Sequence, residues 1–380
     1  MADNFHNKPF DEATKLKLEI FGECFREWLP VFIFNPTISK IFIYDYFAGS
    51  GKDIIGFPGS PLILLNEAKG ENCSVCKSLN GKEIIFAFND KNKSQELEIS
   101  VKEYLDNCIK DNCKKEKCQY SWHIGNYEFR EAFERENVKK ILKDKNYAKF
   151  IILDQFGFSQ VDENVFRELT NAPKTDFIFF IASSFIDRFK NHEYTKKYFD
   201  TSKIDFESKQ PIERHELIAN YFERLVDKIE YYVHHFTIKK GSNYYGLIFG
   251  TSHTYGMEKF LKICWKKDEF SGEANDNKYL DYNKGTLFYN PHESNKLNNV
   301  REEIISKVLS GEIKDNITGL KYALKKRCLP ELFTKTIKEL EKDGRIIRQG
   351  DVNNRSTNIH NIPLYSILIK SDESIKNRMD

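Results

Sequence analysis

The sequence predicts an α/β protein, in which a largely parallel β-sheet is covered by helices on both faces and a smaller domain follows. Three observations support this fold class. Segments typical of strands alternate with helical segments over residues 40–185, and the strand segments are apolar on both faces. Residues 230–252 have the pattern of strand, turn and strand with no intervening helix. From about residue 300, three helical segments precede a final pair of strands.

The first domain opens with a helix and then alternates strands with helices. Apolar residues recur at helical spacing over residues 11–34, and Pro30 closes that pattern. In the next helix Ser60 is the expected cap, Pro61 the first helical residue and Gly70 the stop. The expected strands are 40–47, 82–91, 120–129, 148–158 and 175–185. The expected helices that follow the first four strands are 60–69, 94–109, 131–144 and 162–171.

An antiparallel β-hairpin is expected at residues 230–252, where two apolar segments flank the turn sequence Lys-Gly-Ser-Asn. Five βα units closed by an antiparallel pair of strands form the order of the class I methyltransferase sheet. We therefore predict a Rossmann-like sheet of that type. An amphipathic helix follows at 255–268, and residues 186–225 are charged and helical, which indicates a lid or an insertion.

The domain boundary is expected near residue 298, after a loop and linker at 266–298. Residues 1–298 then form the Rossmann-like, methyltransferase-type domain, with a Cys-rich insertion at about 70–120 and the helical insertion at about 186–225. Residues 299–380 form three helices and a β-hairpin around a polar turn, which is the arrangement of a winged-helix domain.

The composition places no strong limit on function. The 380 residues carry 59 Lys and Arg against 57 Asp and Glu, so the net charge of +2 indicates no particular partner for the molecule as a whole. The first residues are polar and acidic, and no apolar run reaches the roughly 18–20 residues that a membrane span needs. We therefore expect a soluble, cytoplasmic protein with no membrane partner.

Five of the eight cysteines cluster, and an intracellular compartment should keep them reduced. Cys73 and Cys76 form a Cys-x2-Cys pair, and three more thiols follow within a lysine-rich stretch that includes Cys108. A tetrahedral zinc site could use four of the five, namely Cys73, Cys76, Cys113 and Cys118. The later spacing is loose, and five thiols do not suit a four-ligand site. Free thiols are the alternative, and we expect no zinc.

Two glycines one residue apart follow the first strand of the sheet. A Walker loop would need glycine where Tyr46 stands and Ser or Thr where Asp53 stands, so an ATP-type phosphate loop is not supported. Glycine has no Cβ, so Gly49 and Gly51 let the turn tighten and let a ligand lie against main-chain N–H groups. In methyltransferases a turn of this kind meets the amino-acid arm and the ribose of S-adenosylmethionine.

Acidic residues stand at the ends of the following strands, at the edge where open α/β sheets bind ligands. Asp90 ends the second strand, as a ribose-binding acid should, and Glu128 ends the third, near the expected place of an adenine-contacting acid. Asp154 ends the fourth strand, where catalytic acids of this fold project. Each acid could instead cap the helix that follows it. Together with the glycine turn, the acids favour a nucleotide-type site.

At these residues the chain resembles the three-Cys-motif partner protein family. The resemblance rests on YDYFAGSG…GFPGSPLILLNEA after the first strand, FNDKN after the second, ILDQFGFSQV after the fourth and YYGLIFGTSHTYGMEKFLKICW late in the sheet. It covers most of the chain. Members look like class I methyltransferases and occur beside a radical-SAM protein of the three-Cys-motif type. The resemblance implies S-adenosylmethionine as cofactor, a partner protein encoded nearby, and a role in anti-phage defence or a mobile element.

The resemblance also assigns site residues. It carries Asp45, Gly49 and Gly51 over to the nucleotide loop and Asp90 to the second acid, while Asp154, Phe156 and Gly157 match the fourth-strand motif. The candidate cofactor-binding residues are Asp45, Phe47, Gly49, Gly51, Asp90 and Glu128. The candidate catalytic residues are Asp154 and Phe156.

One residue departs from the family motif, because Gln155 stands where the family has proline. DNA amino-methyltransferases use Asp or Asn, two prolines and an aromatic residue at this place. The acid and a backbone carbonyl accept hydrogen bonds from the target amine, and the aromatic ring stacks on the extruded base. Asp154 and Phe156 remain here, but both prolines are missing. Methyl transfer to an exocyclic amine is therefore possible but not supported.

The C-terminal segment is rich in basic residues, as phosphate contacts require. A winged helix would place the helix at 332–342 in a nucleic-acid groove and residues 350–358 as the wing. The same surface could serve protein contacts or dimerisation. The candidate nucleic-acid-binding residues are Lys325, Lys326, Arg327, Lys335, Lys338, Arg348 and Arg355.

Several other polar and aromatic residues have a structural interpretation. His234 and His235 alternate across a strand, and the inward one is expected to be buried and hydrogen-bonded rather than catalytic. Ser252 and His253 follow the last strand of the sheet, but nothing marks a nucleophilic triad. Three aromatic residues are expected in the core, namely Tyr46, Trp122 and Trp265.

Three functions are compatible with these residues. The first is a methyltransferase-like protein that uses S-adenosylmethionine and acts on nucleic acid, which the intact glycine loop favours. The second is a catalytically degenerate nucleotide-binding or scaffold module, which Gln155 favours. The third is a nuclease that holds a divalent metal between Asp45, Asp90 and Asp154, and it leaves the glycine loop without a role.

Overall fold

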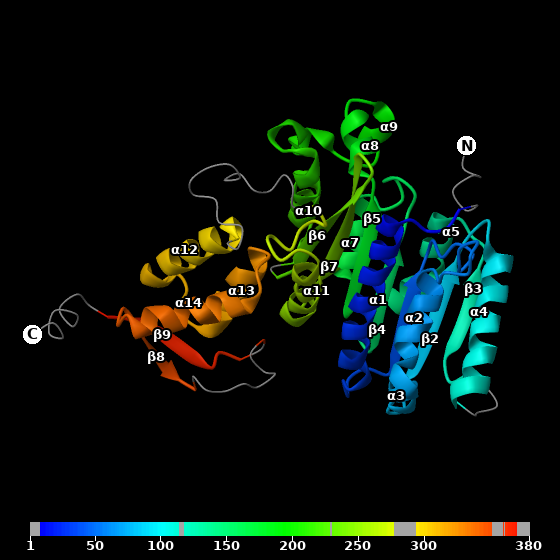
Figure 1. Cartoon of the computed structure of the whole chain (residues 1–380), viewed down its shortest axis with the longest axis horizontal. Helices are drawn as coiled ribbons and strands as arrows, with labels where there is room; N and C mark the ends of the chain where they lie inside the picture. The colour runs from blue at the N-terminus through cyan, green and yellow to red at the C-terminus, as the bar shows by residue number, and fades with distance from the viewer. Residues whose placement is uncertain are drawn as a thin grey trace, which may run out of the picture. The chain divides into compact units, whose positions relative to one another are not determined.

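The computed structural model describes residues 8–113, 118–228, 230–276, 294–351, 360 and 362–370. The chain divides into two compact units, Met1–Ser252 and His253–Asp380 (Figure 1). None of the helices in these described ranges combines the length and the apolar character that a membrane-spanning helix requires.

A seven-stranded sheet organises the first unit. The strands follow the order β3-β2-β1-β4-β5-β7-β6, in which β1 to β5 are parallel and β7 is antiparallel to both β5 and β6. The strands are β1 (Lys40–Asp45), β2 (Glu83–Asn89), β3 (Ser121–Gly125), β4 (Tyr147–Leu153), β5 (Thr175–Ile181), β6 (Tyr232–Lys240) and β7 (Asn243–Thr251). The predicted parallel sheet with an antiparallel hairpin is confirmed, and it fits a Rossmann-like methyltransferase fold.

Helices cover both faces of this sheet, and one group of them lies on the face that Figure 1 turns toward the viewer. Phe25 and Trp28 of the first helix pack on Phe150 of β4, with ring centroids 5.5 and 5.2 Å apart. Long N-terminal helices with this apolar stripe are driven onto a sheet by burial of the aromatic rings. The helices of this face are α1 (Glu12–Ile33), α2 (Ser60–Lys69) and α4 (Ser94–Cys108).

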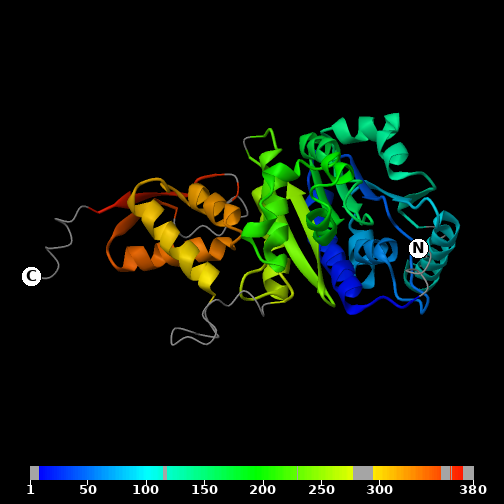
Figure 2. The same cartoon turned by 90° about the horizontal axis from the view of Figure 1, so that it is seen from above.

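The opposite face carries a second group of helices (Figure 2). Here Phe166 and Phe222 pack on each other, with ring centroids 4.5 Å apart, and both contact Phe179 of β5. All three rings are buried in one continuous core with residues of β1, β4 and β6. The helices of this face are α5 (Phe129–Glu134), α6 (Glu136–Lys143), α7 (Glu163–Asn171) and α10 (Arg214–Arg224).

Three helix boundaries differ from the expected ones. Pro30 does not close α1 but lies in its last turn, because its carbonyl still accepts a hydrogen bond from the N–H of Phe34 at 3.2 Å. Ser60 is the first residue of α2, and Gly59 is its N-cap. The helix expected at 131–144 is split into α5 and α6, because the backbone of Arg135 is extended.

The two expected insertions have different structures. Residues 70–120 contain β2 and α4, which belong to the central sheet and to its covering layer, together with the short helix α3 (Ser74–Lys77). Residues 186–225 are helical in part, as predicted. They contain the second half of α8 (Ser183–Arg188), together with α9 (Glu193–Lys196) and α10.

The second unit contains helices and a two-stranded antiparallel sheet. Ile304, Phe333, Ile337 and Ile367 are buried in its core. Strand β9 also contacts the segment before α13, because the N–H of Ile367 donates to the carbonyl of Lys314 at 2.8 Å. The elements are α11 (Thr254–Lys267), α12 (Asn295–Leu309), α13 (Asn316–Lys325), α14 (Pro330–Lys342), β8 (Ile346–Gly350) and β9 (Tyr365–Ile369).

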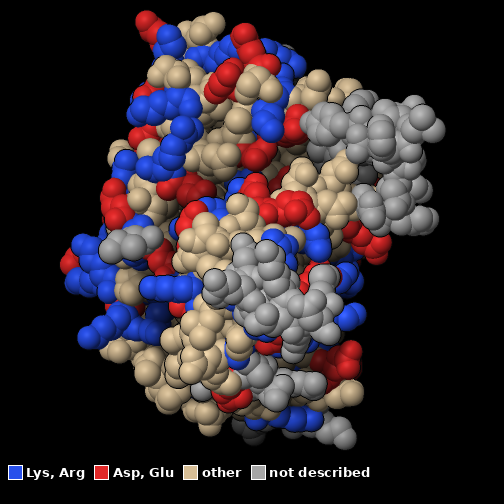
Figure 3. Space-filling view, turned by 90° about the vertical axis from the view of Figure 1, so that its left-hand side faces the viewer, with Lys and Arg blue, Asp and Glu red and all other residues tan. Residues whose placement is uncertain are grey.

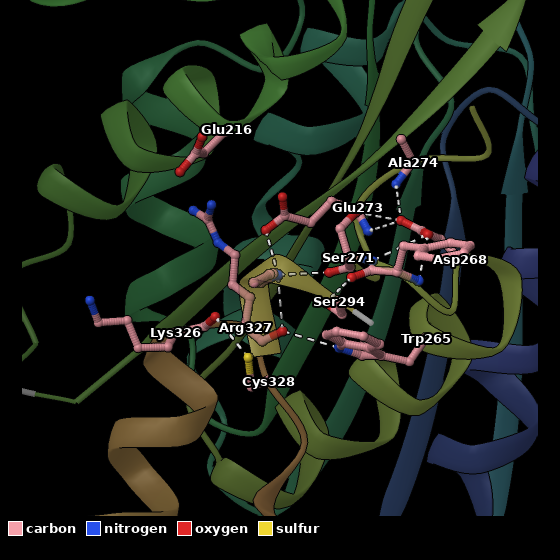
Figure 4. Close-up of polar contacts among 12 residues, drawn as sticks. Glu216, Trp265, Asp268, Ser271, Glu273, Ala274, Ser294, Lys326, Arg327 and Cys328 are labelled. Carbon is pink, nitrogen blue, oxygen red and sulfur yellow. Dashed lines mark hydrogen bonds and ion pairs between the residues drawn. The ribbon is translucent and has the colours of Figure 1, made fainter. Parts of the chain in front are cut away.

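The second unit begins at residue 253 rather than at the expected 299, and a polar cluster explains why (Figure 4). The indole of Trp265 on α11 donates to the carbonyl of Arg327 at 3.1 Å. Lys296 on α12 donates to the carbonyl of Ser271 and to the carboxylate of Glu273, both at 2.7 Å. These bonds hold α11 and the described residues after it against the C-terminal helices, so the described residues of the expected linker belong to the second unit.

Candidate functional site

Three predicted acids lie at the carboxyl edge of the sheet. Strand β1 pairs in parallel with β2 on one side and with β4 on the other, so Asp45, Asp90 and Asp154 follow neighbouring strands. The negative charges of Asp154 and Asp90 both act on the carboxyl group of Asp45. The structure therefore brings these three predicted site residues together.

Asp45 is the buried member of this group. Its side chain is fully buried, and one oxygen, Oδ1, accepts a hydrogen bond from the N–H of Phe47 at 3.1 Å. The other oxygen, Oδ2, is buried and has no hydrogen-bond partner within the described part of the chain. Burial raises the pKa of Asp45 to about 7 against the Ser60 hydroxyl and the Phe47 N–H, which lower it, and the charges of Asp154 and Asp90 act in the same direction as burial. A buried oxygen without a donor is costly, so it marks a place where a ligand or water donor would fit.

The two glycines of the loop are required for different reasons. Both have a left-handed backbone, with φ of +61° at Gly49 and +83° at Gly51. A Cβ on Gly51 would lie 3.0 Å from the Cβ of Ser100 on α4, so Gly51 allows close packing against that helix. A Cβ on Gly49 would meet no atom within 4 Å, so the space beside Gly49 is open. Only Gly49 therefore faces room that a ligand could fill.

Asp90 connects this loop to the end of β2. Its Oδ2 accepts the N–H of Gly49 at 3.0 Å, and its Oδ1 accepts the N–H groups of Asn92 and Lys93, both at 2.9 Å. The alternative of a capping role is thus correct in part, because Asp90 orders the turn before α4. A carboxylate has about four acceptor positions, and these three bonds leave one on Oδ2.

The residues after the glycines confirm that this is no Walker loop. The ammonium of Lys52 pairs with Glu103 on α4 at 2.6 Å. Asp53 accepts the N–H of Phe57 at 2.8 Å through Oδ1 and the N–H of Phe10 at 2.8 Å through Oδ2. Both side chains hold the loop in place, and the lysine does not lie along a phosphate-binding turn.

Glu128 and Phe47 lie at the margin of the group. Glu128 is the N-cap residue of α5 rather than the last residue of β3, and its side chain is 63% exposed and paired with Lys91. The half-buried ring of Phe47 packs on Phe129, with centroids 5.3 Å apart. Within the described ranges, neither the Glu128 side chain nor the Phe47 ring forms a hydrogen bond with Asp45.

Asp154 has a partner that sequence reasoning missed. The ammonium of Lys17, on α1, lies 2.5 Å from Oδ2 of Asp154 and 4.9 Å from the ring centroid of Phe180. The two charged side chains are only 14% and 17% exposed. Helical spacing could have indicated that Lys17 points toward the sheet, because Lys17 lies on the same face of α1 as the buried residues Ile20 and Phe21.

Gln155 holds together the loop that contains the fourth-strand motif. Its Oε1 accepts the N–H groups of Gln160 and Val161 at 2.9 and 3.2 Å, and its Nε2 donates to the carbonyl of Phe180 at 3.0 Å. The side chain is 1% exposed. Phe156, the next residue, is 79% exposed. The loop thus presents an aromatic ring from a backbone that Gln155 orders.

The residues predicted for metal binding do not form a metal centre. Across the described ranges, no group of three or more His, Cys, Asp or Glu side chains could hold a metal ion. Two of the three acids that the nuclease hypothesis would use are engaged, Asp154 by Lys17 and Asp90 by backbone N–H groups. No disulfide bond joins the described cysteines of the cluster, namely Cys73, Cys76, Cys108 and Cys118. The side chain of Cys113 lies outside the described residues.

The predicted basic residues of the second unit divide into two groups. Three of them are engaged within the unit. Arg348 is 11% exposed and pairs with Glu341 at 2.5 Å, Lys326 pairs with Glu303 at 2.6 Å, and Arg327 is buried. The prediction that these three contact nucleic acid is therefore not supported by their positions. The exposed residues of the set are Lys325, Lys335 and Lys338. Arg355 lies outside the described residues.

The residues interpreted as structural are mostly buried. Tyr46 is in the core, and His234 and His235 are buried with ring centroids 5.3 Å apart. The Nδ1 atom of His253 accepts the N–H of Tyr255 at 3.0 Å, so His253 caps α11. Two of the aromatic residues expected in the core are half-buried, namely Trp122 and Trp265.

Comparison with known proteins yields structural similarity without sequence similarity. No protein-family model matches the chain, and no curated protein matches it. Trm1 from Pyrococcus horikoshii, solved with S-adenosyl-L-methionine, is 11% identical with a TM-score of 0.38, and the match covers 97% of this chain and 94% of that one. An O-methyltransferase from Bacillus cereus, in complex with SAH, is 12% identical with a TM-score of 0.32, over 64% and 91% of the two chains. TYW2 from P. horikoshii, in complex with MeSAdo, is 10% identical with a TM-score of 0.27, over 65% of each chain.

The likeness to these solved methyltransferases is remote. With TM-scores below 0.5, the fold of this chain is defined by its own strand order rather than by these structures. The functional residues are likewise defined by the geometry at the carboxyl edge of the sheet.

Substituting Gln155 should loosen the motif loop. In Gln155→Ala the N–H groups of Gln160 and Val161 lose their acceptor, and leaving buried donors unpaired costs about 1–3 kcal/mol. We expect faster hydrogen exchange at these two amides and a lower urea midpoint for the first unit. Gln160→Ala is the control, because it keeps the acceptor in place and should change neither measurement. Unchanged exchange in Gln155→Ala would contradict the assignment.

Asp45→Asn should change how stability depends on pH. The carboxyl of Asp45 titrates at about 7 when folded and near its usual value of 3.8 when unfolded, so only the folded protein holds this proton between these values. The free energy of unfolding therefore falls as the pH rises through this window. Asparagine has no proton to lose. The free energy of unfolding of Asp45→Asn should therefore fall by a few kcal/mol less than that of the wild type as the pH rises through this window. Urea denaturation at several pH values measures the effect.

The matched control for this experiment is Asp53→Asn. Burial acts to raise the pKa of Asp53, but the backbone N–H groups of Phe10 and Phe57 outweigh it and hold the pKa below its usual value. Its charged form is therefore stabilising, and the substitution should lower stability most at neutral pH. Parallel pH curves for the wild type and Asp45→Asn would show that Asp45 does not titrate as described.

Proposed function

We propose that the first unit binds S-adenosylmethionine beside Gly49 and transfers its methyl group to nucleic acid. The observation that carries this proposal is the combination of open space at Gly49 with two carboxylates that still have acceptor positions. Asp45 offers the buried Oδ2 atom, and Asp90 offers the remaining acceptor position on its own Oδ2. The bound cofactor supplies an electrophilic methyl group, and the residues of this chain would hold its polar parts.

Each part of the cofactor has a candidate partner among these residues. The backbone at Gly49 accommodates the part that lies against the loop, because no side chain intervenes. Asp90 would accept a ribose hydroxyl, and its position is fixed by three backbone N–H groups. Asp45 suits the ammonium of the amino-acid arm, because a positive charge would favour its ionised form. Phe156 is exposed at the same edge and would contact the acceptor.

We propose in addition that residues 299–380 form a winged helix that binds nucleic acid. What supports this is the order of helices and strands in the second unit and the exposed Lys335 and Lys338 of α14. These two lysines are three residues apart and lie on one face of the helix. Lys and Arg side chains gather along one side of the face drawn in Figure 3, with acids interspersed. Such a surface suits phosphate contacts, which are largely independent of sequence.

The cellular setting of this activity is inferred from the resemblance to the three-Cys-motif partner proteins. It suggests a cytoplasmic role in anti-phage defence or a mobile element, beside a radical-SAM partner protein. A second candidate function is a nucleotide-binding module without catalysis. The observation that favours it is the pairing of Asp154 with Lys17, which leaves the expected catalytic acid engaged in the absence of substrate.

Cofactor binding tests the first proposal. We expect the purified chain to bind S-adenosylmethionine in isothermal titration calorimetry and to lose most of that affinity in Gly49→Val and in Asp90→Ala. Valine at position 49 would place its side chain in the open space and strain the left-handed backbone. Gly81→Val is the matched control, because Gly81 also has a positive φ of 74° and open space around it but lies in the turn before β2. Equal loss in both glycine variants would indicate strain rather than a binding site.

Nucleic-acid binding tests the second proposal. Replacing Lys335 and Lys338 together by Ala should weaken binding of duplex oligonucleotides at low salt, because phosphate contacts are lost. The slope of log affinity against log salt concentration should become shallower by about 1 for each contact removed. Fluorescence anisotropy over a series of salt concentrations measures both. Lys140→Ala on α6 is the control, since Lys140 is exposed but belongs to the first unit. An unchanged slope in the double variant would refute the assignment of α14.

A further inference from the structure

The expected catalytic acid, Asp154, forms an ion pair with Lys17. Lys17 and Asp154 are separated by 137 residues in sequence, yet their charged atoms lie 2.5 Å apart. Removing two charges from water is costly, so a largely buried pair persists only where its geometry is good. The ring of Phe180 supports this geometry, because its centroid lies 4.9 Å from the ammonium of Lys17. The carboxyl end of β4 therefore presents a cation as well as an acid.

This arrangement is unfavourable for an amine acceptor. Methyl transfer to an amine builds positive charge on nitrogen, and the N–H groups of the amine need hydrogen-bond acceptors. A fixed ammonium at the same place opposes that charge. A nearby acceptor is also engaged, since Oε1 of Gln155 binds two N–H groups, which occupy both of its lone pairs.

The same arrangement is favourable for a hydroxyl acceptor. A hydroxyl oxygen gains negative charge as it loses its proton, and a nearby ammonium stabilises that charge. It also needs one base for its single proton, and Asp154 has a second carboxylate oxygen, Oδ1, for this purpose. Resting on the proposed cofactor site, we propose that this site methylates a hydroxyl oxygen, with Lys17 facing that oxygen and Asp154 accepting its proton. In RNA the acceptor is the ribose 2′-hydroxyl, which DNA lacks.

The reaction balances with these two side chains and the cofactor alone. The acceptor oxygen forms a bond to the methyl carbon while the carbon–sulfur bond of the sulfonium breaks and its electron pair stays on sulfur. The hydroxyl proton passes to Asp154 and from there to water. Lys17 keeps its proton throughout, so the pair returns to its starting state.

The acceptor atom can be identified from the methylated product of the wild-type protein. The full-length chain is incubated with methyl-labelled S-adenosylmethionine and with an RNA or a DNA oligonucleotide of the same sequence. We expect label in the RNA only, in linkages that resist alkaline cleavage because the 2′-oxygen is blocked. Label in a base nitrogen, equal labelling of DNA, or no transfer to RNA would each overturn this inference. If calorimetry shows cofactor binding in these cases, the cofactor site itself stands; if the cofactor does not bind, both proposals fail.

Variants of Lys17 test its role directly. Lys17→Met should lower the rate of transfer to RNA by about 100-fold, the scale seen when one stabilising donor is removed, with unchanged cofactor affinity. The deficit should shrink as the pH rises, because the hydroxyl then ionises without help, and Lys17→Arg should restore part of the rate. A merely structural role would produce none of this pH dependence. Lys15→Met is the control, because Lys15 lies on the same helix but pairs with exposed Glu12. A Lys17→Met protein as active as the wild type would overturn the inference.

Discussion

The position of β1 between β2 and β4 is the constraint on which the site depends. Three parallel strands end at the same edge of the sheet. Asp45 is the last residue of β1, and Asp90 and Asp154 come directly after β2 and β4. Three carboxylates so close together would repel one another if all were charged and unpaired. The structure resolves this repulsion differently for each acid.

Each solution leaves its acid with a different chemistry. Asp90 accepts hydrogen bonds from three backbone N–H groups, which also fixes the glycine loop. Asp154 is balanced by the ammonium of Lys17. Asp45 is buried, and none of the cations in the described part of the chain pairs with it, so its pKa rises to about 7 and it is protonated over part of the physiological range. One edge of a sheet thus combines a fixed acceptor, an ion pair and a carboxyl that can change its charge.

The sequence predicted what depends on local pattern. Alternating strands and helices, the hairpin at 232–251 and the left-handed glycines follow from residues that are near one another in the chain. Lys17 could not be found in this way, because its partner lies 137 residues away and no local pattern encodes that pairing. Arg348 and Lys326 also look like phosphate ligands in sequence but pair with Glu341 and Glu303, because α14 packs against β8 and α12 against α13.

Gln155 shows how a residue that differs from the motif the chain resembles can still order the loop. Proline after the acid would stiffen the loop by fixing φ. Gln155 stiffens the same loop with three side-chain hydrogen bonds, so Phe156 is still presented from an ordered turn. The amide oxygen of Gln155 is taken up by two backbone N–H groups, so this side chain adds no free acceptor beside Asp154. That engaged oxygen and the ammonium of Lys17 at Asp154 are the two features on which the proposed hydroxyl acceptor rests.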